Sequence, residues 1–205
     1  PTAIARPSSG DWNPHRRLGR VSSMSNKLEL LVVGAGPCGI AVGAAAKKAG
    51  VSCVLFDRGC ITQSLTNYPY YMTFFSTAFM LEVGDVPFTI PESKPTRREA
   101  LVYYRRVVEH WDVDVRQYQN VDEISGSEGD FTVRTSKRDG TQEIFSAKSV
   151  VFATGGFHHP NFLEVPGEEL DKVHHYYHEP YAYYAQDVLV VGAGNSAVES
   201  ALEMY

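Results

Sequence analysis

The hydrophobic positions of the chain fall into short continuous runs that glycine-rich turns interrupt. Residues 28–33 ("LELLVV") form the first run and a glycine turn follows them. Residues 40–50 ("IAVGAAAKKAG") are rich in alanine and end in a glycine, which predicts a helix with a glycine just past its end. Residues 51–57 ("VSCVLFD") are a second β-branched run. Strand, turn, helix and strand within about 30 residues predict a βαβ unit with a parallel sheet.

The middle of the chain extends this pattern. Residues 58–96 are rich in turns and aromatic residues, which predicts an irregular segment lining a site. Residues 96–111 carry a helix start signal, because Thr96 is followed three residues later by Glu99. Residues 113–118 predict a third parallel strand, and the alternation over 121–148 predicts a small antiparallel meander. Residues 149–156 ("SVVFATGG") predict a return to a buried strand.

The first glycine turn has the spacing GxGxxG, with Gly34, Gly36 and Gly39 between the first strand and its helix. In such a turn the first glycine permits the tight bend, the second lets the backbone approach a pyrophosphate, and the third lets helix and strand pack closely. Asp57 ends the second strand, where a carboxylate can accept hydrogen bonds from ribose hydroxyls. This context predicts a dinucleotide site, against the simpler interpretation of a glycine turn with a solvated aspartate.

A second turn repeats the pattern near the end of the chain. Gly192, Gly194 and Ala197 form GxGxxA after the apolar run 188–191, which predicts a strand, and before a helix. Two such turns predict two dinucleotides on one chain. With the strand end "FATGG" (152–156) between them, they indicate an α/β flavoprotein of two Rossmann-like units, with FAD in the first and NAD(P)H in the second.

The domain boundaries follow from this interpretation. We expect a disordered N-terminal tail over residues 1–27, an FAD-binding domain over 28–165 with the meander at 121–148, and the start of an inserted NAD(P)H domain over 166–205. That second domain is incomplete, so we expect the sequence to be part of a longer protein. The position that separates NADH from NADPH, at the end of the next strand, lies beyond Tyr205.

Composition narrows the class further. The net charge of −5 argues against a nucleic-acid or anionic membrane surface, because nothing offsets phosphate repulsion. No apolar run approaches the length of about 18 residues that a membrane span needs. The three cysteines lack a CxxC spacing, which favours a reducing cytoplasm. Five of seven histidines lie in 158–178 without ligand spacing, so we expect no metal and place them in an interdomain crossing.

A set of motifs resembles the bacillithiol-disulfide reductases, which are thioredoxin-reductase-like flavoproteins. The motifs are "GPCG", "NYP" (67–69), "TFFS" (73–76), "GDVPF" (84–88), "ESKPTRREALVYYRRVV" (92–108), "ATGG" (153–156) and "GAGNSA" (192–197). The resemblance covers about residues 28–205. It implies NADPH-dependent reduction of a small-thiol disulfide such as bacillithiol disulfide, cytoplasmic redox homeostasis, bacilliredoxin-type protein partners and a homodimer.

Cys38 lies inside the first glycine turn, where the resemblance implies a redox cysteine. At a helix N-terminus a thiolate is stabilised by the helix dipole and free N–H groups, and so becomes a nucleophile toward a disulfide. The alternative is that a small side chain simply fits there. Cys53 is expected to be a core thiol, and Cys60 a bystander in a loop.

Other functions remain open, including other disulfide, quinone or ferredoxin reductases on the same scaffold. A flavin-dependent monooxygenase shares the layout, but "LDKVHHYYH" (170–178) lacks the Phe and Gly of its FxGxxxH fingerprint. A flavin-binding redox sensor would bind FAD without turnover. The expected FAD contacts are Gly34, Gly36, Pro37, Cys38, Gly39, Asp57, Arg58, Asn67, Thr73, Val121, Ala153, Thr154 and Gly155, and the expected nicotinamide-nucleotide contacts are Gly192, Gly194, Asn195, Ser196 and Ala197.

Overall fold

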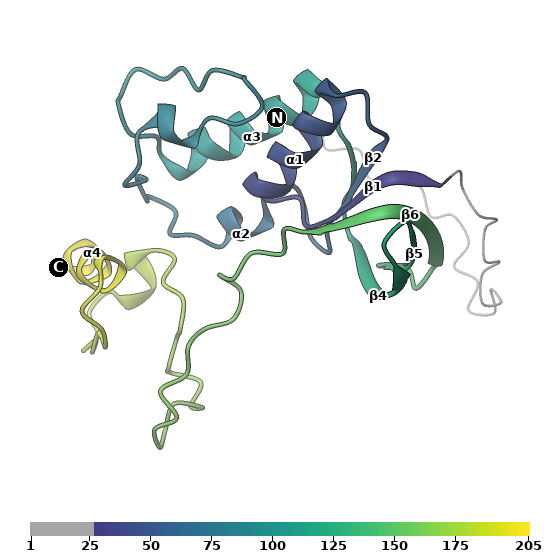
Figure 1. Cartoon of the computed structure of the whole chain (residues 1–205). Helices are drawn as coiled ribbons and strands as arrows, with labels where there is room; N and C mark the ends of the chain where they lie inside the picture. Colours follow the sequence, from purple (N-terminus) through teal and green to yellow (C-terminus); the bar gives the residue numbers. More distant parts are fainter. Residues whose placement is uncertain (1–26) are drawn as a thin grey trace, which may run out of the picture.

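The computed structural model describes residues 27–205, so the predicted N-terminal tail lies, except for Lys27, outside the described residues. A mixed six-stranded sheet organises the protein in the order β3-β2-β1-β6-β5-β4 (Figure 1). The strands are β1 (Leu28–Val33), β2 (Cys53–Phe56), β3 (Asp114–Arg116), β4 (Gln119–Ser127), β5 (Asp130–Lys137) and β6 (Gln142–Phe152). The helices are α1 (Pro37–Lys48), α2 (Gln63–Thr66), α3 (Arg97–Trp111) and α4 (Asn195–Met204), with 3₁₀ turns η1 (Ala78–Leu81) and η2 (Pro180–Tyr183).

The parallel half of the sheet confirms the predicted βαβ unit. β1 pairs in parallel with both β2 and β6, and β2 pairs in parallel with β3. Helix α1 begins at Pro37, three residues before the predicted start, because proline at the first helical position has the φ angle that the helix needs. Gly50 follows the helix with φ of 71°, as predicted for a C-terminal glycine.

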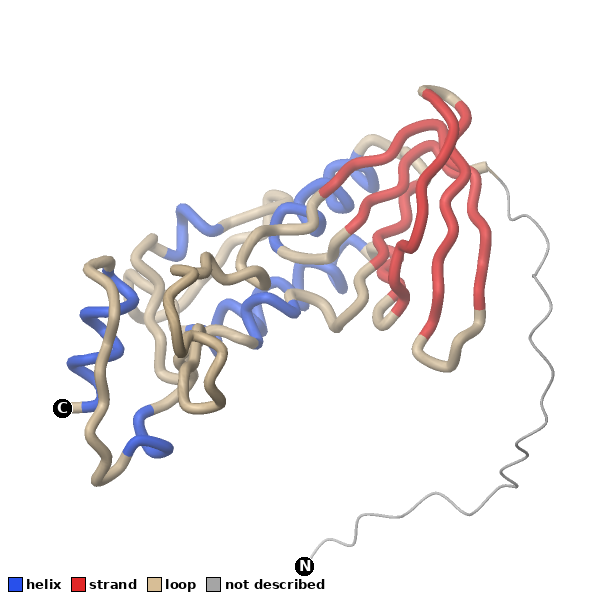
Figure 2. The backbone as a smooth tube through the Cα atoms, turned by 90° about the horizontal axis from the view of Figure 1, so that it is seen from below, coloured by secondary structure: helices blue, strands red, loops and turns tan. Residues whose placement is uncertain are grey.

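Helices α1 and α3 pack on one face of the sheet and enclose its main core (Figures 1 and 2). The predicted capping box of α3 is present, with the Glu99 N–H donating to the Thr96 hydroxyl and the Glu99 carboxylate accepting from the Thr96 N–H. Tyr103 on the same helix donates to the Val86 carbonyl at 2.8 Å, and Trp111 to the Gly84 carbonyl at 2.7 Å. These bonds hold part of the irregular segment 58–96 against the helix.

The antiparallel meander is confirmed, with one difference from the prediction. β6 pairs with β5 along its first half and with β1 along its second half, so the last meander strand and the returning parallel strand are one element. Leu31, Phe56 and Val133 are buried between the parallel strands and the meander, and Phe56 contacts Phe145 with ring centroids 4.8 Å apart. The meander therefore encloses a second core on the face opposite α1.

The predicted strand at 188–191 is wrong as a strand of a sheet. These residues pair with no other strand among those the structure describes, and Leu189 and Val191 are largely exposed. An extended segment becomes part of a sheet only when a neighbour accepts and donates its backbone hydrogen bonds. Residues 153–205 leave the end of β6 as irregular chain and lie beside the main body, with α4 against η2 (Figure 1).

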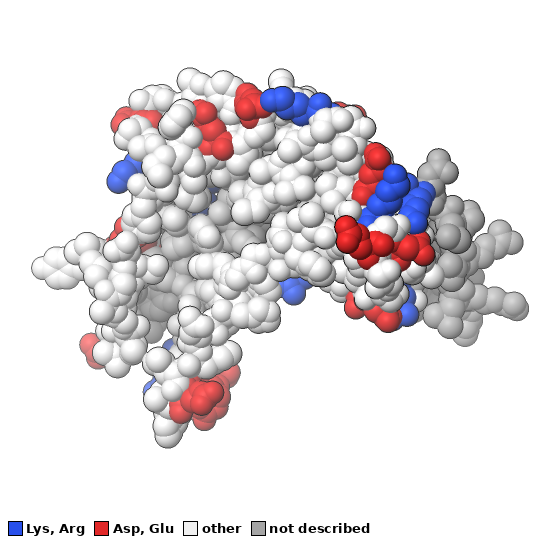
Figure 3. Space-filling model, viewed as in Figure 1, with Lys and Arg blue, Asp and Glu red and all other residues white. Residues whose placement is uncertain are grey.

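On the face seen in Figure 3 the charged side chains lie mainly along the edge. A dense group lies at the end that carries the meander, others lie along the top and at the lower end, and the middle of this face is almost free of charge. Exposed ion pairs such as Lys27–Asp130 at 2.7 Å add little stability. None of the helices in residues 27–205 combines the length and apolar character that crossing a bilayer requires.

Candidate functional site

The first glycine turn joins β1 to α1, and each of its glycines has a different spatial reason. Gly34 has φ of 110°, and a Cβ there would lie 2.3 Å from the Ala153 carbonyl oxygen. A Cβ on Gly39 would lie 2.0 Å from the Gly34 carbonyl oxygen. Gly36 differs, because a Cβ there would meet nothing within 4 Å and its φ is −76°. The protein itself needs Gly34 and Gly39, whereas Gly36 faces open space.

The N-terminus of α1 presents unpaired donors at this open side. Gly36 is the N-cap residue and makes no side-chain capping bond, and the first turn contains no acidic residue. Pro37 has no N–H, while the N–H groups of Cys38 and Gly39 lie in the first turn, where no intrahelical acceptor exists. Free N–H groups and the positive end of the helix dipole favour an anion. This geometry fits a pyrophosphate.

Asp57 lies directly beside the turn and is already engaged with the backbone. Its Oδ2 accepts from the Ala35 N–H at 2.8 Å, and its Oδ1 accepts from the Gly59 N–H at 2.8 Å. A carboxylate offers about four acceptor sites, so two remain for ribose hydroxyls. Asp57 therefore holds the turn in place in addition to offering acceptors at its edge.

We expect Asp57→Asn to lower the stability of the protein. Asparagine has one carbonyl oxygen, so one of the two backbone N–H groups loses its acceptor at a cost of about 1–3 kcal/mol. Thermal unfolding without added nucleotide measures this loss. Asp139→Asn is the control, since its carboxylate accepts one loop N–H, from Thr141 at 2.9 Å, in a fully exposed turn. An equal change in the unfolding temperature of both variants would contradict the role of Asp57 in holding the glycine turn.

The strand end Ala153–Thr154–Gly155 lies against the first glycine turn. The Ala153 N–H donates to the Val33 carbonyl at 2.8 Å, which continues the β1–β6 ladder by one residue. The Ala153 carbonyl then lies against Gly34, and Gly155 bends the chain with φ of 67°. Thr154 and Gly155 are exposed. The structure thus brings together the first glycine turn, Asp57 and the Ala-Thr-Gly strand end.

The three cysteines have different environments. Cys38 is exposed at the second position of α1. Cys53 is buried in β2 as predicted, and burial raises the pKa of its thiol to about 11. Cys60 is half-buried, its thiol donates to Gln63 Oε1 at 3.2 Å, and burial raises its pKa. Among the three thiols, that of Cys38 belongs to the most exposed residue in this structure.

Other predicted contact residues are more dispersed. Arg58 and Asn67 are exposed in the loops around α2, and Thr73 is exposed and bridges to Thr96 at the start of α3. Val121 is half-buried in β4 and packs against the second core. The structure gives no direct contact between Thr73 or Val121 and the glycine turn, and both stay predictions.

Sequence reasoning missed Thr62. Its backbone N–H donates to the Ala35 carbonyl at 2.9 Å, so the loop after β2 holds the glycine turn from a second direction. Gln117 supports this loop by accepting from the Ile61 N–H at 3.0 Å. No motif marks these residues, because the contacts are made by backbone atoms brought together by the fold.

The second glycine turn adopts a similar local geometry. Gly192 has φ of 142°, and a Cβ there would lie 3.2 Å from the Ala197 Cβ. Gly194 is the N-cap residue of α4 without a side-chain capping bond, and a Cβ on it would meet nothing within 4 Å. Asn195 and Ser196 begin the helix. The close approach and the open position recur in the order seen in the first turn.

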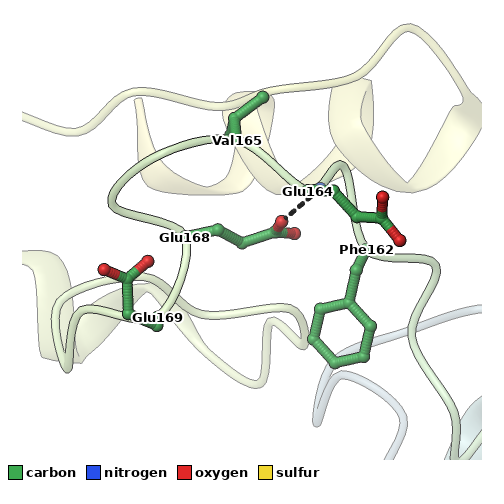
Figure 4. A pocket seen from close by; sticks show the side chains of 5 residues that line it. All are labelled: Phe162, Glu164, Val165, Glu168 and Glu169. Atoms are coloured by element: carbon green, nitrogen blue, oxygen red, sulfur yellow. Dashed lines mark hydrogen bonds between the residues drawn. The ribbon is translucent and has the colours of Figure 1, made fainter.

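A pocket in the crossing segment is separate from both turns. Phe162, Glu164, Val165, Glu168 and Glu169 line it (Figure 4). Glu168 accepts from the Glu164 N–H at 2.7 Å and lies 3.0 Å from His175 Nε2, so its carboxylate is used within the loop. No group of three or more metal-ligating side chains occurs in residues 27–205. Neither observation adds chemistry to the glycine turns.

Residues 31–205 match the family model of the pyridine nucleotide-disulphide oxidoreductases, and the chain belongs to this family. Among curated proteins it is similar to bacilliredoxin reductase Bdr of Bacillus subtilis (strain 168), with 38% identity over 175 residues that cover 85% of this chain and 52% of the relative. The chain thus spans about half the length of the curated relatives it matches. The family confirms the predicted fold class and implies FAD and NADPH as cofactors.

Solved structures give the same result. The bacillithiol disulfide reductase Bdr (YpdA) from Bacillus cereus matches at 42% identity with a TM-score of 0.83, over 87% of this chain and 55% of that one. The enzyme from Staphylococcus aureus matches at 38% identity with a TM-score of 0.81, over 88% of this chain and 54% of that one. A flavin monooxygenase from Stenotrophomonas maltophilia matches at 23% identity with a TM-score of 0.76, over 88% of this chain and 55% of that one. This likeness shows a shared fold alone. The resemblance to bacillithiol-disulfide reductases is therefore confirmed.

Proposed function

We propose that the full protein is an FAD-dependent, NADPH-consuming reductase of bacillithiol disulfide. The observation that carries this proposal is the first glycine turn, whose open Gly36 and free α1 N–H groups fit a pyrophosphate. The relatives at 38–42% identity, which are named as bacilliredoxin and bacillithiol disulfide reductases, support the substrate class.

The residues of the chain have distinct roles in this proposal. The turn at residues 34–39 holds the FAD pyrophosphate, and Asp57 accepts from the ribose while it holds Ala35. The turn at residues 192–197 holds the NADPH pyrophosphate. Held by these residues, FAD would supply two-electron transfer between NADPH and the disulfide. The protein supplies position and electrostatics.

Cys38 is proposed as the relay between FAD and the substrate. Its thiolate attacks one sulfur of the disulfide, the sulfur–sulfur bond breaks, and one thiol leaves with a proton. The other half stays bound to Cys38 as a mixed disulfide. Two electrons from NADPH and a proton then release the second thiol and restore the Cys38 thiolate. The exposure of Cys38 at the first turn of α1 supports this role.

Bacilliredoxin-type proteins are proposed as partners, because the Bacillus subtilis relative is named for their reduction. A homodimer and a cytoplasmic role in redox homeostasis are proposed from the resemblance to bacillithiol-disulfide reductases. Size-exclusion chromatography with light scattering tests the dimer on the full protein.

The decisive experiment follows NADPH oxidation by the full protein without oxygen, with and without bacillithiol disulfide. We expect turnover that requires the disulfide and yields two thiols for each NADPH. NADPH consumption that begins only when oxygen is admitted would support the monooxygenase alternative instead. Bound FAD that NADPH does not reduce would support a redox sensor.

A further inference from the structure

Thr62 is a buried residue in a backbone conformation that β-branched side chains rarely adopt. Its φ of 55° and ψ of 36° lie in the left-handed region, and only 1% of the residue is exposed. Such a conformation is unfavourable for a branched Cβ and persists where neighbouring contacts hold it. Here its hydroxyl donates to the Ile61 carbonyl at 2.7 Å, and its own carbonyl accepts from the Leu65 N–H at 2.9 Å.

The two peptide groups that flank Ala35 are both held from outside the turn. Its N–H donates to Asp57 at 2.8 Å, and its carbonyl accepts from the Thr62 N–H at 2.9 Å. In a planar trans peptide the carbonyl and the following N–H point in opposite directions. The bond from Thr62 to the Ala35 carbonyl therefore also fixes the direction of the Gly36 N–H.

The Gly36 N–H points away from the Thr62 loop, because it lies opposite the Ala35 carbonyl in their shared trans peptide. A Cβ on Gly36 would meet nothing within 4 Å, and no acceptor for its N–H is found among residues 27–205. A donor held in this way needs no rearrangement when an anion binds, which lowers the cost of binding.

We propose that Thr62 is a positioning residue whose left-handed backbone aims the Gly36 N–H at the pyrophosphate of the bound dinucleotide. This inference rests on the proposed FAD site. In this inference the backbone conformation of Thr62 orients the donor, and its side chain stabilises that conformation. Because the Leu65 N–H bond to the Thr62 carbonyl holds the chain after Thr62, φ and ψ of Thr62 set how the Ile61–Thr62 peptide, whose N–H bonds Ala35, is oriented relative to α2.

Two substitutions in the full protein separate positioning from packing. Thr62→Val keeps the branched shape but loses the hydroxyl bond that supports the left-handed backbone. Thr62→Gly removes the side chain but adopts positive φ freely. If Thr62 positions the donor, Thr62→Val weakens FAD binding at least about tenfold, and Thr62→Gly keeps an FAD affinity within about threefold of the original protein. If Thr62 only fills space, Thr62→Gly weakens FAD binding more than Thr62→Val does.

FAD affinity is measured by quenching of flavin fluorescence on titration into the apoprotein, with circular dichroism to verify the fold. Thr66→Val is the matched control, because the Thr66 hydroxyl also donates to a backbone carbonyl, that of Gln63 at 2.6 Å, but from an α-helix. We expect this control to bind FAD normally. The reverse order of Val and Gly, equal losses in both, or no loss in either would overturn the inference. Absence of FAD binding by the unsubstituted protein would instead overturn the proposed function.

Discussion

Gly36→Val is expected to abolish FAD binding while the protein remains folded. A Cβ on Gly36 has nothing within 4 Å and its φ of −76° suits any residue, so we expect the folded protein to accept a side chain there. It fills the space through which the backbone approaches the pyrophosphate. Losing two charge-assisted hydrogen bonds costs about 3–6 kcal/mol, or roughly 10²–10⁴-fold in affinity. Flavin absorbance of the purified full protein and circular dichroism measure the two effects.

Gly194→Val is the matched control for this substitution. Gly194 is the equivalent N-cap glycine of α4, and a Cβ there also meets nothing within 4 Å. We expect this variant to retain FAD and to lose reduction of the flavin by NADPH. Loss of FAD in both variants, or unfolding of Gly36→Val, would show that these glycines serve the fold of the protein rather than two separate ligands.

The sequence predicted the local elements well where one residue type decides the geometry. Three features each follow from a steric or hydrogen-bonding requirement of particular residues: the capping box of Thr96, the glycine after α1 (Gly50) and the GxGxxG turn. The βαβ unit can also be predicted from the sequence, because its hydrophobic runs are continuous and its turns contain glycine.

The errors arise where tertiary contacts decide the outcome. Residues 188–191 read as a strand, yet they have no hydrogen-bonded neighbour among the described residues. The continuity of β6 was missed because the alternating pattern of its meander half changes to a buried run where it joins β1. The role of Thr62 was inaccessible, since it depends on a backbone bond between segments 27 residues apart in the sequence.

Cys38→Ala is expected to stop disulfide-dependent NADPH oxidation while FAD stays bound. Alanine preserves the small size and the helical start, so the N–H groups of the turn remain in place. The substitution removes the sulfur that forms the mixed disulfide, and direct reduction of a disulfide without that intermediate is expected to be at least about 100-fold slower. Anaerobic turnover with bacillithiol disulfide measures this loss.

The control for Cys38→Ala is Cys60→Ala, because that thiol is half-buried, bonded to Gln63 and held protonated by its raised pKa. We expect the control to turn over normally. Mass spectrometry of the full protein trapped with excess disulfide adds a second measurement, since the adduct is expected on Cys38 and absent from Cys38→Ala. Full activity in Cys38→Ala would refute the relay and leave Cys38 as a small residue that fits beside the pyrophosphate. The electrons would then pass to the disulfide directly, and the exposed position of Cys38 would carry no catalytic meaning.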